Sequence, residues 1–171
     1  MQERTGIVES RGKPLTLLGN EIKVGDKAPD FETLDTSLQP VKLSSYKGKV
    51  VVLSTVPSLD TQVCDLETKQ FNKEAKELGN DVVFITVSMD LPFAQKRWAD
   101  EAGVKDIQLA SDHKSAGLGT SYGVLIKELR LLARTVFVID KSGVVRYIQY
   151  VKETGTEPDY DEVLAAVKKL L

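Results

Sequence analysis

Cys64 is the only cysteine of the chain, and it stands in segment 57–65, PSLDTQVCD, between an apolar run and an amphipathic one. This pattern predicts that the thiol lies in the first turn of a helix. Unpaired backbone N–H groups and the positive end of the helix dipole favour an anion there. The position therefore favours the thiolate, which is the nucleophilic form of cysteine.

Three further residues could assist a thiolate at position 64. Thr61 precedes Cys64 by three residues, so on a helix the two side chains share a face, and the hydroxyl can bond to the thiolate or to a substrate. Thr61 could also cap the helix. Pro57 would close the pocket without adding a competing donor. Arg134 is distant in sequence, but from the start of a strand in the same sheet it could bring a permanently charged guanidinium to the sulfur.

The elements that must position these residues alternate between strand and helix, which predicts an α/β fold with a mixed central β-sheet flanked by helices. The β-branched run 50–53, VVVL, is typical of a strand buried on both faces. An N-terminal β-hairpin is predicted within the first thirty residues. The remaining predicted elements are helices from Cys64 to Leu78, 92–102, 115–122 and from Pro158, and strands at 82–87, 107–109, 135–139 and 144–148.

Composition limits the function classes. The chain has 171 residues, and its 42% apolar content suits one domain spanning 1–171. Lysine and arginine number 23 against 25 acidic residues, interspersed along the chain, which gives no sign of a nucleic-acid or membrane partner. The N-terminus lacks an apolar signal core, so we expect a cytoplasmic protein. A single cysteine excludes an internal disulfide.

The spacing Pro57-x-x-x-Thr61-x-x-Cys64 after an apolar strand resembles the active-site motif of the peroxiredoxin superfamily. Further segments resemble its thiol peroxidase subfamily from about residue 14 to the C-terminus: 14–20 PLTLLGN, 24–31 VGDKAPDF, 90–95 DLPFAQ, 133–134 AR and 157–160 EPDY. The resemblance implies a thioredoxin-like fold and reduction of hydrogen peroxide or organic hydroperoxides through a sulfenic acid on Cys64. It also implies Arg134 beside the sulfur, no metal or organic cofactor, thioredoxin or another thiol as reductant, and a homodimer.

Thiol acidity alone does not explain such a reaction. Lowering the pKa of a thiol from about 8.5 to about 6 raises its ionised fraction at pH 7 about thirtyfold. The weaker basicity lowers nucleophilicity roughly 10- to 18-fold, so about a two- to threefold advantage is left. Thr61, Arg134 and backbone N–H groups must therefore orient the peroxide and stabilise the charge that develops as the O–O bond breaks.

The chain departs from the subfamily at the second, resolving cysteine. That cysteine usually follows the DLPFAQ segment, and alignment places Ala99 at its position. An intramolecular disulfide is thus excluded. Two explanations stay open: the protein is a one-cysteine peroxidase resolved by an external thiol, or an engineered substitution has removed the cysteine.

Other functions are compatible with parts of the pattern. A non-enzymatic redox sensor would form mixed disulfides through Cys64, and a cysteine hydrolase would need His113, the only histidine, as its base. The lack of Cys-x-x-Cys disfavours a dithiol oxidoreductase. We expect His113 to be an exposed polar residue and Trp98 to serve packing. Alternating charges after Cys64 predict a solvated helix face comprising Glu67, Lys69, Lys73, Glu74, Lys76 and Glu77.

Overall fold

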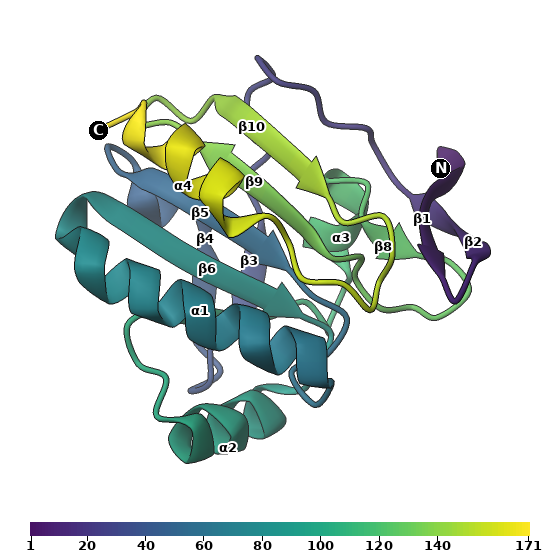
Figure 1. The fold of residues 1–171 in the computed structure, drawn as a ribbon, viewed down its shortest axis with the longest axis horizontal. Helices are drawn as coiled ribbons and strands as arrows, with labels where there is room; N and C mark the ends of the chain where they lie inside the picture. Colours follow the sequence, from purple (N-terminus) through teal and green to yellow (C-terminus); the bar gives the residue numbers. More distant parts are fainter.

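A seven-stranded mixed sheet forms the centre of the computed structural model, which describes residues 1–171 (Figure 1). Its strand order is β10-β9-β5-β6-β7-β3-β4, with β5, β6 and β7 parallel and the other pairs antiparallel. The strands are β3 (Glu32–Leu34), β4 (Pro40–Lys42), β5 (Val50–Thr55), β6 (Val82–Ser88), β7 (Gln108–Ser111), β9 (Thr135–Ile139) and β10 (Val145–Tyr150).

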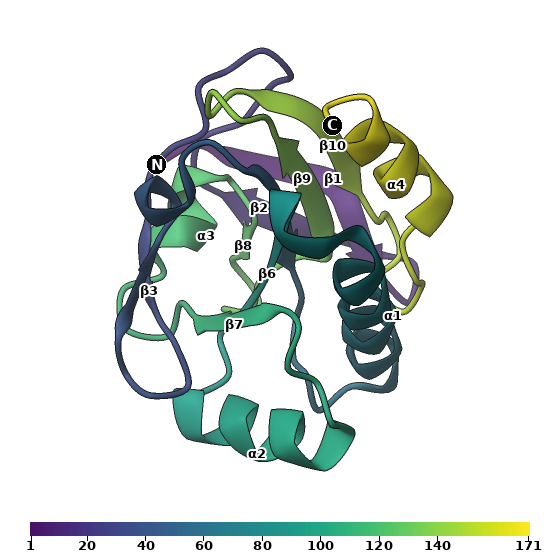
Figure 2. The ribbon, with the colours of Figure 1, turned by 90° about the vertical axis from the view of Figure 1, so that its left-hand side faces the viewer.

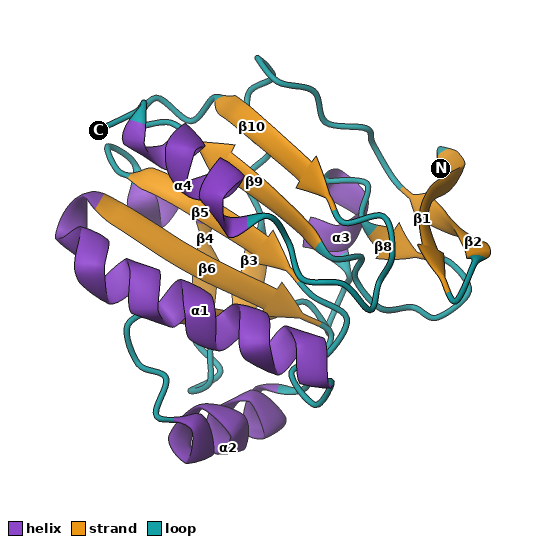
Figure 3. Ribbon diagram, viewed as in Figure 1, coloured by secondary structure: helices purple, strands orange, loops and turns teal.

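The helices flank this sheet (Figures 1 and 3). They are α1 (Gln62–Leu78), α2 (Pro92–Ala102), α3 (Gly117–Ser121) and α4 (Tyr160–Lys168), with short 3-10 turns at Leu43–Tyr46 and Gly79–Asp81. Helices α1 and α4 lie on one face, whereas α2 lies beside β7 at the lower margin of Figure 2. No helix combines the length and apolarity that crossing a membrane would need.

Strand β5 is buried on both faces, as its β-branched sequence predicts. Val50 and Val52 pack with Phe71 of α1 and Val163 of α4, among other residues, on one side of the sheet. Val51 and Leu53 point into a larger cluster on the opposite side. The alternation follows from the two-residue period of a strand, and it determines which face of the sheet each side chain at the end of β5 points to.

The N-terminal hairpin is confirmed: β1 (Glu3–Ser10) pairs antiparallel with β2 (Lys13–Leu18). A third strand, β8 (Leu125–Ile126), adds to β2 and completes a separate small sheet. Buried residues of this sheet belong to the larger core cluster. The predicted α/β architecture is therefore correct, although the sequence analysis did not identify the short strands β3, β4 and β8.

Candidate active site

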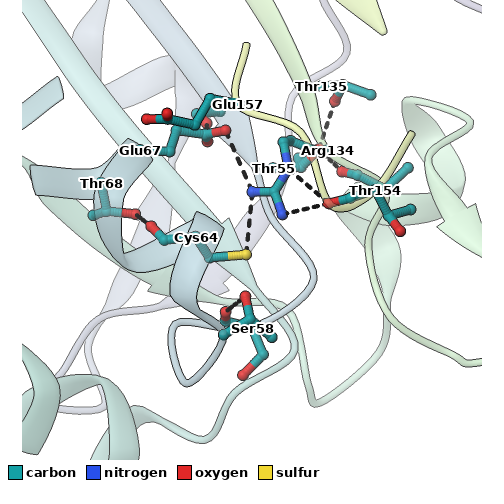
Figure 4. Close-up of polar contacts among 12 residues, drawn as sticks. Thr55, Ser58, Cys64, Glu67, Thr68, Arg134, Thr135, Thr154 and Glu157 are labelled. Carbon is teal, nitrogen blue, oxygen red and sulfur yellow. Dashed lines mark hydrogen bonds and ion pairs between the residues drawn. The ribbon is translucent and has the colours of Figure 1, made fainter. Parts of the chain in front are cut away.

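The sulfur of Cys64 lies in the first turn of α1, directly after the loop that leaves β5 (Figure 4). The residue is fully buried. Thr61 occupies the N-cap position with an extended backbone, but its hydroxyl makes no capping bond. The first amides of α1 therefore have no side-chain acceptor, and the positive end of the helix faces the region of the sulfur, as the sequence predicted.

Arg134 is the polar partner of the sulfur. It precedes β9 and is 2% exposed, and its Nη1 donates to Cys64 Sγ at 3.2 Å. The orientation of the guanidinium is fixed by two further hydrogen bonds, because Nε and Nη2 both donate to the Thr154 carbonyl at 3.2 and 2.8 Å. The predicted approach of Arg134 to Cys64 is thus present in the structure. A fixed guanidinium offers this sulfur positive charge without any change of side-chain conformation.

The backbone around Arg134 is fixed by the ends of two strands. Its carbonyl accepts from the Val151 amide at 3.0 Å, and the carbonyl of Ala133 accepts from the Thr55 hydroxyl at 2.7 Å. Thr55 also hydrogen-bonds to Thr135 across the β5–β9 pair. The end of β5 therefore determines both where α1 begins and where Arg134 lies.

Glu67 is a site residue that the sequence analysis missed. The prediction that it belongs to a solvated face is wrong: Glu67 is 0% exposed, and its Oε1 lies 3.4 Å from Arg134 Nη1. Its Oε2 accepts from the Ser54 hydroxyl at 2.8 Å. Glu67 follows Cys64 by three residues, which is the helical spacing that pairs Cys64 with Thr61 in the other direction. That spacing was the available signal.

Burial governs the acidity of Glu67. Loss of solvation raises the pKa of its carboxyl from 4.5 to about 7, although the charge of Arg134 and the hydroxyl of Ser54 act in the opposite direction. The negative charge of Glu157 adds a small further increase to this pKa. Near neutral pH the Arg134–Glu67 pair thus exchanges between an ion pair and a neutral acid beside a cation.

The loop between β5 and α1 is organised by Asp90. Its carboxylate accepts from the Ser58 hydroxyl at 2.7 Å, from the Leu59 amide at 2.8 Å and from the Ser88 hydroxyl at 2.7 Å. The Thr61 hydroxyl donates to the Ser58 carbonyl at 2.8 Å rather than to Cys64. Asp90 therefore fixes the segment that carries Thr61, and a hydroxyl contact with the sulfur requires rotation of that side chain.

Pro57, Thr61 and Arg134 line one cavity of about 290 Å³, which also takes in Ser10 and Arg11 of the N-terminal hairpin. Apolar surface is supplied by Val63, Ile126 and Leu129. Three of the four predicted site residues therefore line this cavity. The fourth, Cys64, does not line it but contacts Arg134, which does. Cavities of this size accommodate small ligands.

His113 and Trp98 are not bonded to the sulfur. The ring of His113 hydrogen-bonds to Ser111 at 2.9 Å and is partly buried rather than exposed. Trp98 is buried, as predicted, and donates from Nε1 to Asp65 at 2.8 Å. Ala99 packs against the small apolar cluster that contains Cys64 and Trp98. No three His, Cys, Asp or Glu side chains converge as a metal-ligand set.

Comparison with known proteins places this geometry in a family context. The pattern of the family described as Redoxin matches residues 23–164. The chain is 53% identical over 161 residues to a thiol peroxidase of Halalkalibacterium halodurans, covering 94% of this chain and 96% of the relative. It is 50% identical to a thiol peroxidase of Bacillus subtilis, with the same coverage of both chains. The crystal structure of a peroxiredoxin-like protein from Aquifex aeolicus superposes over the whole of both chains with a TM-score of 0.91 and 44% identity.

Proposed function

The chain belongs to the redoxin family and is a thiol-dependent peroxidase, and we propose that Cys64 is the residue that attacks the peroxide. One observation carries the assignment of the residue: its sulfur lies at the start of α1, 3.2 Å from the guanidinium of a buried arginine. Two sources of positive potential meet at this single thiol.

The reaction follows from these positions. The Cys64 thiolate attacks the outer oxygen of the hydroperoxide, an S–O bond forms as the O–O bond breaks, and the departing oxygen takes up a proton to leave as an alcohol or water. Arg134 stabilises the sulfur before attack and the developing charge on oxygen during it. Pro57 shapes the cavity, and Thr61, after rotation of its hydroxyl, orients the peroxide.

Reduction of the sulfenic acid requires an external thiol, because the chain holds no second cysteine. A first thiol condenses with the sulfenic acid to give a mixed disulfide and water, and a second thiol releases Cys64 in reduced form. We propose thioredoxin as the physiological reductant. Ala99, which packs against the cluster containing Cys64, leaves an apolar methyl group where a resolving thiol would otherwise stand.

Cys64→Ser is expected to abolish peroxide consumption while the circular dichroism spectrum and unfolding midpoint stay close to those of the wild type. The assay follows hydrogen peroxide and cumene hydroperoxide with thioredoxin, glutathione or dithiothreitol as reductant. Retained consumption in Cys64→Ser would refute the assignment. Rapid oxidation of wild-type Cys64 without turnover in any reductant would favour the redox sensor instead.

We further propose one domain over residues 1–171, a homodimer and a cytoplasmic location. The domain is supported by a core cluster that includes residues as distant as Val8 and Val145. The dimer is supported by Leu91 and Phe93, which expose 52% and 68% of their surface beside the loop that Asp90 fixes. Light scattering of Phe93→Glu, expected to be monomeric, tests the dimer. The need for a thiol reductant fits the cytoplasm.

A further inference from the structure

Two acids share one cation in the interior of this site. Nη1 of Arg134 lies 3.2 Å from Cys64 Sγ and 3.4 Å from Glu67 Oε1, and all three residues are almost completely buried (Figure 4). Arg134 is the only basic side chain paired with Glu67. If the thiolate and the carboxylate were both ionised, the buried group would carry one uncompensated negative charge, which is costly away from water.

Mutual repulsion makes the two ionisations exclude each other. The two distances place Sγ and Oε1 at most about 6.6 Å apart, the sum of 3.2 and 3.4 Å. At an effective dielectric constant of about 20, a thiolate at that separation raises the proton affinity of the Glu67 carboxylate by at least about 70-fold. The arrangement of lowest cost therefore places a single negative charge, on either the sulfur or the carboxyl, beside Arg134.

We propose that Glu67 acts as a proton reservoir for the Cys64 reaction: it holds a proton while Cys64 is a thiolate and releases that proton when the sulfur becomes a neutral sulfenic acid. This inference rests on the proposed function and deepens it. Glu67 does not touch the peroxide, so it is a positioning residue that acts through Arg134. The buried site keeps the same net charge before and after the oxidation.

The proton and electron balance closes with the groups present. Without the reservoir, the thiolate, the hydroperoxide and one proton from water give sulfenic acid and alcohol. With it, the protonated Glu67, the thiolate and the hydroperoxide give the Glu67 carboxylate, sulfenic acid and alcohol. The sulfur loses two electrons and the O–O bond gains them. Glu67 releases its proton to water and the departing oxygen takes one from water, so no direct contact is needed.

The groups that face Glu67 from neighbouring elements are consistent with this exchange. Arg134 before β9 and the Ser54 hydroxyl at the end of β5 contact the carboxyl. Glu157, from the loop before α4, raises the pKa of Glu67, and Tyr160 of α4 donates to Glu157 at 2.7 Å. Burial raises the pKa of Glu67 to about 7, and a thiolate beside the same guanidinium raises it further. The largest change in Glu67 protonation is therefore expected near pH 8.

The test measures proton uptake during a single turnover. Reduced enzyme, freed of reductant and held in weak buffer at pH 8 with a pH indicator, receives one equivalent of hydrogen peroxide. Absorption at 240 nm verifies that Cys64 starts as a thiolate. The wild type is expected to take up well under half a proton per Cys64, and Glu67→Gln about one. Glu77→Gln, which changes an exposed glutamate of the same helix, is the matched control and is expected to behave as the wild type.

The outcomes separate the two proposals. Uptake of one proton by wild type and Glu67→Gln alike, with sulfenic acid formed, overturns the reservoir and leaves the peroxidase assignment intact. Failure to form sulfenic acid on Cys64 refutes the assignment itself. Infrared difference spectra of the wild type need no variant, so they serve if Glu67→Gln does not fold. Loss of a protonated carboxyl band on oxidation supports the reservoir, and an unchanged band overturns it.

Discussion

Two arginine–carboxylate pairs lie at the two ends of β9. At its start, Arg134 and Glu67 are 3.4 Å apart and are 2% and 0% exposed at their side chains. Beyond its end, Arg146 and Asp140 are 2.7 Å apart, and the Arg146 side chain is 50% exposed. The shorter ion pair is the solvated one, and the longer pair shares its cation with a sulfur. Ion-pair distance therefore does not indicate where the chemistry lies, whereas burial and competition for a shared cation do.

Cavity size is an equally poor guide. A cavity of about 630 Å³ lies at the Asp140 end and is lined by Tyr46, Ile139 and four lysines, namely Lys27, Lys47, Lys49 and Lys141. The cavity beside Arg134 is about 290 Å³. Only the smaller cavity is lined by a buried charged side chain that contacts the nucleophile, because the end of β5 and the start of α1 meet there.

Removal of each arginine is expected to give the largest contrast. Arg134→Ala leaves Glu67 buried without its cation and Cys64 without its donor, so we expect a loss of about 3–5 kcal/mol in stability and a roughly 100- to 1000-fold fall in the oxidation rate. Arg146→Ala should cost at most about 1 kcal/mol and leave the rate unchanged. Urea unfolding and stopped-flow oxidation measure both. Equal effects at the two ends would contradict the comparison.

The pH dependence of stability should have opposite signs at the two ends. The folded-state pKa of Glu67 is raised to about 7 from 4.5, so the folded protein binds more protons between these values and loses stability as the pH rises through that range. The change is on the order of 3 kcal/mol. Hydrogen bonds from Val144, Ser142 and Arg146 outweigh burial and lower the pKa of Asp140 below 3.8, so its contribution is lost only as the pH falls through the acid range.

Glu67→Gln and Asp140→Asn separate these two slopes. In urea unfolding at pH 3 to 8, Glu67→Gln should flatten the decline in stability between pH 4.5 and 7, whereas Asp140→Asn should change the slope only in the acid limb below about pH 4. A wild-type curve without a decline above pH 5 would show that Glu67 is ionised throughout. It would then be fully paired with Arg134.

Each end also has a loop organised by one aspartate, which permits a smaller contrast. Asp90→Asn replaces a carboxylate that accepts three hydrogen bonds in the active-site loop, and we expect a roughly tenfold slower oxidation of Cys64 with a small loss of stability. Asp140→Asn alters the β9–β10 turn, where the side chain accepts from the Ser142 and Val144 amides. It should not change the rate. Equal rates in the two variants would show that the Asp90 contacts do not position the loop.

His113→Ala is expected to have the smallest effect. The ring makes one side-chain hydrogen bond, to Ser111, and none to Cys64, so a stability loss of up to about 1 kcal/mol and an unchanged peroxidase rate are expected. A large loss of activity would revive the hydrolase alternative, which needs a base. Assays with hydroperoxides and with a thioester substrate distinguish the two reactions.

Much of the architecture could be predicted because it repeats a local pattern. The run 50–53 predicts a strand buried on both faces, and the helix predicted to end near Leu78 does end there, before Gly79, whose φ is positive at 75°. Strands β3, β4 and β8 have two or three residues each, which is too short for a period to show. Their pairing depends on residues far away in sequence.

In the site, too, local features could be predicted from the sequence, whereas contacts between distant residues could not. The position of Cys64 in the first turn of a helix that begins after Thr61 could be predicted from the sequence, whereas the Thr61 hydroxyl donates to the Ser58 carbonyl and not to the sulfur. Helical spacing also reaches forward from Cys64 to Glu67, but the surrounding lysines and glutamates suggested a solvated face, and only the packing of Arg134 explains why one of these carboxylates is buried. The Arg134–Cys64 contact joins residues 70 positions apart, and spacing alone could not predict it.

The hydrogen bonds that fix the Arg134 guanidinium have a consequence for sequence variation. Two of its nitrogens are held by the backbone carbonyl of Thr154, not by the side chain, and every amino acid supplies such a carbonyl. Evolution is therefore free to change the identity of residue 154 while it retains the orientation of the guanidinium. An insertion or deletion in the 151–159 loop would not be tolerated in the same way, because it would move the carbonyl of residue 154 away from the guanidinium.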